Sequence, residues 1–350
     1  MIREYIPVLL ENHDLTREQA ETAMLDIMTG QATPSQISAF LIGLKKKGET
    51  VEEITAIARV MRSVGRTISP KVEGYLLDTC GTGGDITKTF NISTTAAFVI
   101  AAAGVRVAKH GNRSFTSRCG SADLLEQLGV KLDMDPELVE KAIEEIGIGF
   151  MFAPNFHPAM KNVASIRREI GVRTVFNILG PLSNPAGANA QLIGVYDGGL
   201  LEPMCAAACN LGARSVMTVY GLDGVDEISL TGKTVIVKRQ QDGKAVREEI
   251  LPDDLGLSET TPEVLAGGDS EQNARITARI LSGHLGRDDP RVQIVAANAA
   301  AGLVLCEAAT DMRTGVELAL NAVESGKGLR ILRQLVELSG GNPQRLEIMA

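Results

Sequence analysis

The chain has 350 residues, of which 44% are hydrophobic and 22% are charged, and its formal net charge is −8. This length allows a large buried core and two or three domains. The negative charge argues against an extended nucleic-acid surface, but a phosphorylated ligand needs only a few local cations. The longest apolar runs, 96–105 and 294–306, are too short to span a bilayer, and the N-terminus has no secretory pattern. The five scattered cysteines fit reduced thiols. We therefore expect a cytoplasmic protein that binds neither nucleic acid nor a membrane.

The first 65 or so residues are predicted to be entirely helical. Capping boxes at Thr16 and Thr50 each begin a helix, and Thr33 followed by Pro34 begins another. Apolar residues recur at helical spacing behind these caps. This pattern predicts a compact all-α unit.

From Tyr75 the pattern changes to alternating strands and helices. Strands are expected at 75–78, 105–108, 148–153, 191–196 and 215–220, and helices at 95–104, 121–129, 136–147, 157–170 and 200–211. Two further runs, 235–239 and 245–250, flank Asp242-Gly243 and predict a hairpin. The tail from about Glu271 is helical. Such alternation is typical of a mostly parallel central sheet covered by helices.

We therefore predict an α/β protein with a small all-α domain and a larger α/β domain. The small domain covers residues 1–70, with a returning piece near 165–185. Residues 71–350 form the larger domain.

A glycine-rich loop lies between the strand at Tyr75 and the following helix. Gly81, Gly83 and Gly84 leave backbone N–H groups accessible, and Asn91, Ser93 and Thr94 precede the helix. A strand, a glycine loop and a helix N-terminus together form an anion-binding cradle. The loop matches neither a Walker A motif nor G-x-G-x-x-G. Taken alone, it could equally be a tight turn without a ligand.

A second polar loop, Lys109 to Ser114, follows the next strand, so both loops are expected at the carboxyl edge of the sheet. Asp226-Glu227 follows a later strand and suits Mg²⁺, although adjacent carboxylates are also common on surfaces. Arg167 either ends a solvated helix or holds a carboxylate or phosphate. A packed loop histidine is the favoured interpretation of His157.

No Ser/His/Asp or Cys/His nucleophile arrangement and no zinc-ligand spacing is found. The candidate site residues therefore favour a group-transfer reaction that depends on substrate positioning and electrostatic stabilisation.

A set of motifs in this order resembles the anthranilate phosphoribosyltransferase family. The motifs begin at Gly81 (GTGGD), Asn91 (NIST), Lys109 (KHGNR), Gly120 (GSAD), Arg167 (RREIGVR), Asn177 (NILGPLSNP) and Asp226 (DE). One departure is Tyr220, where many relatives carry histidine.

The resemblance implies transfer of a phosphoribosyl group from phosphoribosyl diphosphate to anthranilate, in tryptophan biosynthesis. It implies that Mg²⁺ is bound by Ser93, Asp226 and Glu227. Anthranilate would contact Gly81, His110, Asn112 and Arg167. Phosphoribosyl diphosphate would contact Gly81, Gly84, Asp85, Thr89, Asn91, Ile92, Ser93, Thr94, Lys109, Gly111, Asn112, Arg113, Ser114, Ser117 and Ser121. No acid–base or nucleophilic residue is implied, and Lys109, His110 and Arg167 matter most.

The resemblance also implies a homodimer through the helical domain. Two other functions stay open at this point. One is a pyrimidine nucleoside phosphorylase of the same fold, and the other is a non-catalytic homologue that binds nucleic acid.

Overall fold

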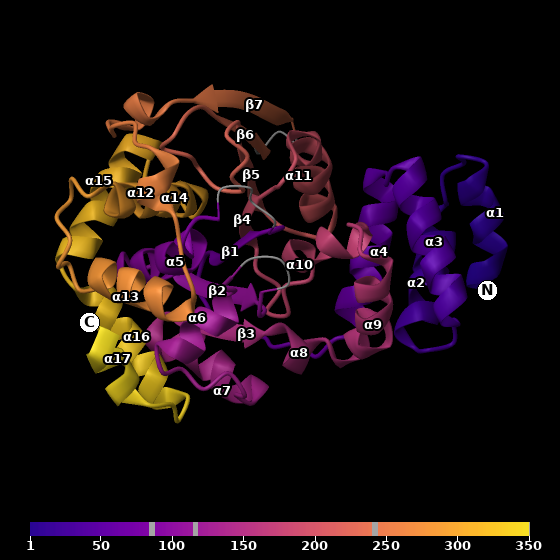
Figure 1. The fold of residues 1–350 in the computed structure, drawn as a ribbon, viewed down its shortest axis with the longest axis horizontal. Coiled ribbons are helices and arrows are strands. Elements are labelled where there is room, and N and C mark those ends of the chain that lie inside the picture. The colour runs from indigo at the N-terminus through magenta and orange to yellow at the C-terminus, as the bar shows by residue number, and fades with distance from the viewer. Residues whose placement is uncertain (84–87, 115–117, 240–243, 350) are drawn as a thin grey trace.

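The computed structural model describes residues 1–83, 88–114, 118–239 and 244–349 (Figure 1). Its N-terminal helices form one end of the molecule, and the sheet with its covering helices forms the rest. The predictions at Gly84, Asp85, Ser117 and the Asp242-Gly243 turn lie outside the described residues.

The N-terminal helices begin where their capping residues predict. The side chains of Thr16, Thr33 and Thr50 each accept a hydrogen bond from the backbone N–H three residues later, which satisfies a donor that a helix start leaves unpaired. These elements are η1 (Ile2–Glu4), α1 (Tyr5–Leu10), α2 (Arg17–Met28), α3 (Pro34–Lys47) and α4 (Val51–Ser63).

The central sheet has the strand order β3-β2-β1-β4-β5-β6-β7. Neighbours from β3 to β5 are parallel, whereas β6 and β7 are added antiparallel. The strands are β1 (Leu76–Gly81), β2 (Arg106–Gly111), β3 (Ile148–Phe152), β4 (Ala190–Gly194), β5 (Ser215–Gly221), β6 (Thr234–Arg239) and β7 (Ala245–Ile250). This arrangement confirms the predicted fold class and the pairing of the last two strands.

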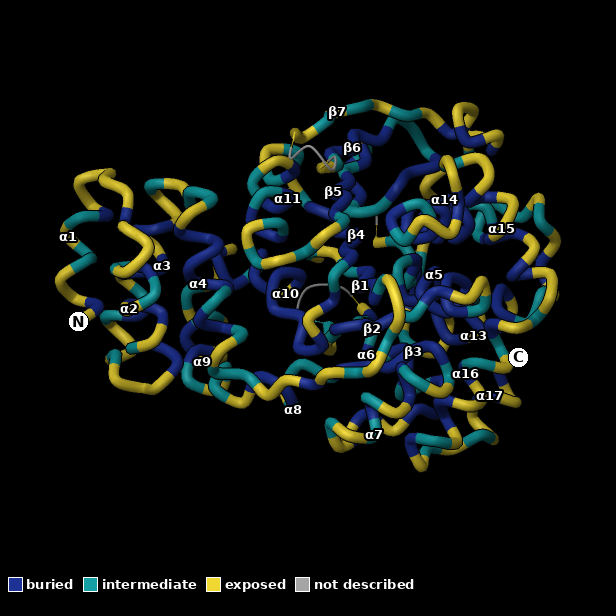
Figure 2. The backbone as a smooth tube through the Cα atoms, turned by 180° about the vertical axis from the view of Figure 1, so that it is seen from behind, coloured by how far each residue is buried: buried dark blue, intermediate teal, exposed yellow. Residues whose placement is uncertain are grey.

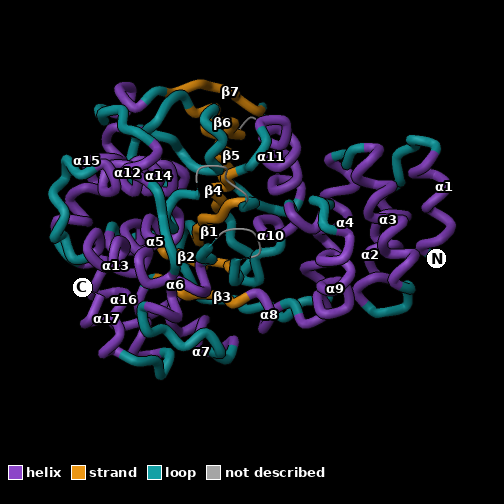
Figure 3. The backbone as a smooth tube through the Cα atoms, viewed as in Figure 1, coloured by secondary structure: helices purple, strands orange, loops and turns teal. Residues whose placement is uncertain are grey.

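Helices cover both faces of the sheet, whose strands form a central column (Figure 3). Helices α5 and α14 pack on one face, and α10 and α11 pack on the other, where α11 also contacts α4. The helices are α5 (Ile92–Ala102), α6 (Ser121–Gln127), α7 (Pro136–Lys141), α8 (Ala153–Phe156), α9 (Lys161–Ile170), α10 (Leu179–Leu182), α11 (Leu201–Asn210), α12 (Pro262–Leu265), α13 (Ser270–Leu281), α14 (Pro290–Leu305), α15 (Met312–Glu324), α16 (Lys327–Leu338) and α17 (Pro343–Met349). Shorter turns are η2 (Ala142–Ile146), η3 (Pro158–Met160), η4 (Val175–Asn177), η5 (Gly198–Leu200) and η6 (Pro252–Leu255).

The buried side chains form two clusters, and the middle strands are buried along their length (Figure 2). One cluster lies between the sheet, α5 and the C-terminal helices. The other joins α1–α4 to Val163, Phe176 and Leu182, and continues to the sheet face under α11. The predicted division at residue 70, with a returning piece near 165–185, stays a prediction.

Three predicted boundaries are wrong in ways that affect the site. Helix α5 begins at Ile92, not at Thr95, because the Asn91 carbonyl accepts the Thr95 N–H at 3.0 Å. Strands β1 and β2 extend about three residues farther than predicted, through Gly81 and Gly111. Parallel pairing with neighbouring strands holds these ends, and that pairing is not a local sequence signal.

Among the described residues, no helix combines the length and apolarity that crossing a membrane requires.

Candidate active site

The glycine loop, the start of α5 and the Asp226-Glu227 pair meet at the carboxyl edge of the sheet. The backbone N–H of Gly83 donates to Asp226 Oδ2 at 2.9 Å, and that of Ser93 donates to Glu227 Oε1 at 3.1 Å. Donors of the predicted anion cradle therefore point at anionic groups, as expected at a helix N-terminus. The structure thus brings together two motifs that lie more than 130 residues apart.

Two strand-end glycines make room for Asp226. A Cβ on Gly81 would collide with the Asp226 carboxylate, and one on Gly194 would overlap the Asp226 backbone. Gly81 and Gly194 are paired residues on β1 and β4. Only a residue without a side chain lets the loop after β5 lie this close to both strands.

Lys109, near the end of β2, is buried, with only 2% of its surface exposed. Its Nζ donates to the Thr79 carbonyl at 2.6 Å, and Thr79 Oγ1 donates to the Ser93 carbonyl at 3.2 Å. Burial lowers the pKa of Lys109, and the negative charge of Asp78 opposes that effect. Lys109 is therefore positioned next to the cradle by β1 as well as by its own strand.

His110 and His157 form a buried edge-to-face pair with ring centroids 5.1 Å apart. His110 Nδ1 lies 3.3 Å from the Gly180 carbonyl, and His157 Nε2 lies 3.1 Å from the Ser183 carbonyl. Burial lowers the pKa of His110 to about 3 and that of His157 to about 4. Both rings are therefore neutral near pH 7, and neither is suited to act as a cationic acid.

The loop after β2 is held by Asp123, whose Oδ2 accepts the backbone N–H groups of Ser114 and Gly120, each at 2.9 Å. Ser121 Oγ donates to the Asn112 carbonyl at 3.3 Å. Burial raises the pKa of Asp123, but these bonds together with Arg113 lower it overall. Gly111 is again obligatory, because a Cβ there would collide with the Ser121 hydroxyl.

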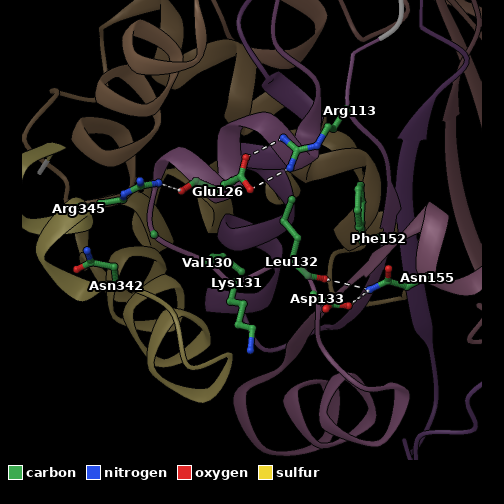
Figure 4. Close-up of a pocket in the computed structure, with 11 residues that line it drawn as sticks. Arg113, Glu126, Val130, Lys131, Leu132, Asp133, Phe152, Asn155, Asn342 and Arg345 are labelled. Carbon is green, nitrogen blue, oxygen red and sulfur yellow. Dashed lines mark hydrogen bonds and ion pairs between the residues drawn. The ribbon is translucent and has the colours of Figure 1, made fainter.

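Arg113 points toward Glu126 and a groove beside it. Its guanidinium donates twice to Glu126, at 2.7 and 2.9 Å, and lies 5.7 Å from the centre of the Phe152 ring (Figure 4). It lines a groove of about 580 Å³ together with Lys131 and Arg345. The role of Arg113 in binding phosphoribosyl diphosphate stays a prediction.

The remaining predicted residues come from three places. Thr89 pairs with Ala266 in an isolated bridge, while Ile92 and Thr94 are buried in the first turn of α5. Asn91 Oδ1 accepts a hydrogen bond from Asn273 at 3.0 Å. Arg167, on α9, lies with its guanidinium 5.4 Å from the Phe176 ring, and burial lowers its pKa.

Sequence reasoning did not assign three residues that organise this site. Asp78, Asp123 and Asn273 are each hydrogen-bonded to a predicted site loop. Asp123 belongs to the GSAD motif, and Asp78 ends the predicted strand 75–78, so an acidic residue in an apolar strand was an available signal. No local sequence pattern marked Asn273 as a residue of the site.

The donor set fits Mg²⁺. Carboxylates of Asp226 and Glu227 lie beside the glycine loop and the Ser93 backbone, and Mg²⁺ commonly takes one or two carboxylates plus water and substrate phosphates. Within the part of the chain that the structure describes, no three acidic, histidine or cysteine side chains gather as a self-sufficient metal site. Mg²⁺ on these two carboxylates would have further coordination positions for water or substrate phosphates.

Fold and site together define a glycosyltransferase with a helical bundle and an α/β domain. Family models of both parts match: the α/β domain of the glycosyl transferase family at residues 73–329 and its helical bundle domain at residues 3–65.

Named relatives specify the family further. The anthranilate phosphoribosyltransferase of Symbiobacterium thermophilum is 52% identical, over 94% of this chain and 95% of its own. That of Roseiflexus castenholzii is 49% identical over 97% and 99%. The crystal structure of the Thermus thermophilus enzyme is 41% identical, covers 96% of this chain and 99% of its own, and superposes with a TM-score of 0.89. The Saccharomyces cerevisiae enzyme in complex with PRPP and Mg is 29% identical, over 97% and 98%, with a TM-score of 0.89. The chain belongs to the anthranilate phosphoribosyltransferase family.

Proposed function

We propose that this chain transfers the phosphoribosyl group of phosphoribosyl diphosphate to the amine of anthranilate. The products are N-(5-phosphoribosyl)anthranilate and diphosphate, and the reaction belongs to tryptophan biosynthesis. The observation that carries the proposal is the convergence of Gly83, Ser93 and the two carboxylates at one sheet edge, in a chain about half identical to named relatives over nearly its full length. The comparisons do not favour the phosphorylase or the nucleic-acid-binding alternative.

The reaction is a displacement at the anomeric carbon, in which the bond to diphosphate breaks and the bond to the anthranilate nitrogen forms. The amine is already a neutral nucleophile, so a strong base is not needed. Burial keeps His110 and His157 neutral, which agrees with that chemistry. The proton released by the amine passes to water or to the departing diphosphate.

The chain's own contribution is to bind and orient the two substrates. The ammonium of Lys109 and the N-terminal dipole of α5 stabilise the negative charge that develops on the diphosphate. Ser93, Asp226 and Glu227 would hold Mg²⁺, which would supply electrostatic stabilisation of the same charge. Arg167 pairs with the anthranilate carboxylate, because a guanidinium matches that group in charge and shape.

We propose further that the chain forms a homodimer through its helical domain and acts in the cytoplasm. Three large apolar side chains on α1, α2 and α3 support this interface, since Leu10, Leu25 and Ile42 are 56%, 46% and 43% exposed. Burial of such side chains drives association. Light scattering of Leu25→Glu with Ile42→Glu should give a monomer if this face is the interface, and an unchanged dimer would place the interface elsewhere.

The loss of anthranilate fluorescence over time, with phosphoribosyl diphosphate and Mg²⁺, tests the activity. We expect loss that requires all three components and disappears in Asp226→Asn with Glu227→Gln. Folded wild-type protein that gives no loss would refute the proposal, and phosphorolysis of thymidine and uridine would then be assayed.

A further inference from the structure

One ionisable group of the site has no role in the proposed chemistry: Asp78, in the middle of β1. Its side chain is fully buried, with 0% of its surface exposed. An isolated carboxylate in such a place is costly and is retained only when it is paired or well hydrogen-bonded.

Asp78 contacts both segments that carry the predicted substrate residues. Its Oδ1 accepts the backbone N–H of His110 at 3.3 Å, and its Oδ2 accepts the Cys80 thiol at 3.6 Å. His110 is next to Lys109 on β2, and Cys80 is next to Gly81 on β1. One carboxylate therefore connects the strand end before the glycine loop to the strand end before the second loop.

Lys109 is bound by the residue next to Asp78 on β1, because its Nζ donates to the Thr79 carbonyl at 2.6 Å. Burial raises the pKa of Asp78, and Asn184, Lys109 and the His110 N–H act against that rise. Burial lowers the pKa of Lys109, and the negative charge of Asp78 is the largest cause acting against that fall. The side chain of Asn184 also donates to the Ala108 carbonyl at 2.8 Å, so the polar groups around the pair come from several elements.

From this geometry we propose that Asp78 is a positioning residue, which holds the His110 backbone, and with it the end of β2 that carries Lys109, where phosphoribosyl diphosphate binds. It touches neither substrate and acts through these two residues. The inference rests on the proposed function, because only that function makes phosphoribosyl diphosphate the ligand of Lys109.

The chain offers a matched control in Glu53. This carboxylate is also 0% exposed, and it pairs with a buried lysine, Lys47, at 2.8 Å. It accepts the backbone N–H groups of Leu15 and Thr50 as well. Glu53 lies in the N-terminal helices, so Glu53→Gln removes an equally buried charge without touching the predicted site.

The first experiment compares Asp78→Asn with Glu53→Gln by calorimetric titration of phosphoribosyl diphosphate with Mg²⁺, and by steady-state kinetics. Both variants should lose stability to urea. Asp78→Asn should bind phosphoribosyl diphosphate about ten- to a hundredfold more weakly, the range of one charge-assisted contact, with little change in KM for anthranilate. Glu53→Gln should retain wild-type affinity. Equal, wild-type affinity in both variants would overturn the proposal and leave Asp78 a purely structural residue.

A second comparison covers the case in which Asp78→Asn does not fold. Lys109→Met removes the positive charge that opposes the buried charge of Asp78, and Asp78→Asn with Lys109→Met removes both charges. The double variant should be more stable than Lys109→Met and should bind phosphoribosyl diphosphate equally weakly, because Asp78 acts through the lysine. Additive losses of affinity would overturn the proposal. Wild-type protein that binds phosphoribosyl diphosphate but leaves anthranilate unchanged would refute the proposed function alone, since these binding comparisons do not need the acceptor.

Discussion

Replacing Gly81 with alanine would test whether the position of Asp226 limits the reaction. The new Cβ would lie 3.0 Å from Asp226 Cγ and closer still to Oδ2. The carboxylate would have to move by about 1 Å, and a misplacement of that size can cost about a hundredfold in rate. Movement would also break the bond from the Gly83 N–H.

The assay is anthranilate fluorescence at a series of Mg²⁺ concentrations. We expect kcat/KM to fall about a hundredfold and the Mg²⁺ concentration for half-maximal rate to rise. Gly286→Ala is the control, because no atom lies within 4 Å of its added Cβ. If folded Gly81→Ala kept wild-type kinetics and the same Mg²⁺ dependence, the close approach of Asp226 to β1 would have no catalytic importance.

Three other substitutions give distinct outcomes. Arg167→Ala should lower kcat/KM for anthranilate about a hundredfold, because it removes charge-assisted hydrogen bonds to the substrate carboxylate. Arg168→Ala, at the exposed neighbouring position, should leave kcat/KM unchanged. Equal effects of the two substitutions would contradict the assignment of Arg167 to anthranilate binding. Asp123→Asn should raise KM for phosphoribosyl diphosphate about tenfold, because it weakens the hydrogen bonds from the Ser114 and Gly120 backbone N–H groups. Glu126→Gln should have a small effect on the same KM. An unchanged KM in Asp123→Asn would mean that the loop after β2 does not need these two hydrogen bonds. Because burial lowers the pKa of folded His157 to about 4, unfolding takes up a proton below the unfolded pKa of about 6.5, so stability is lost as pH falls. In urea titrations at pH 7 and 5, the free energy of unfolding of His157→Gln should fall by about 2 kcal/mol less than that of the wild type. Equal falls in the two proteins would refute the lowered pKa of His157.

The fold was predictable because its main signals are local. Capping residues at Thr16, Thr33 and Thr50 mark helix starts through contacts within one turn. The strand ends were not predictable in the same way. Gly81 belongs to β1 because it pairs with Gly194, more than a hundred residues away, and glycine alone is a weak strand former.

Much of the candidate site was also predictable from the sequence, because glycine loops and adjacent carboxylates are recognisable sequence patterns with known binding properties. The direction in which a side chain points cannot be predicted in this way. Arg113 sits in the same motif as Lys109, yet it faces Glu126 and a separate groove (Figure 4). Asp78 looked like one polar interruption of an apolar strand. Its importance depends on burial and on the neighbouring strand, which only the folded chain brings into contact.

The charges of the cradle explain why this chain would depend on a divalent cation. The N–H groups of Gly83 and Ser93 already donate to Asp226 and Glu227, and a diphosphate needs donors of the same kind. Carboxylates and phosphates repel one another at short range, and the only nearby buried ammonium, among the residues described, is Lys109. Mg²⁺ held by Asp226 and Glu227 would offset that repulsion. A chain with a net charge of −8 can therefore hold a strongly anionic substrate, provided that the metal and Lys109 are both in place.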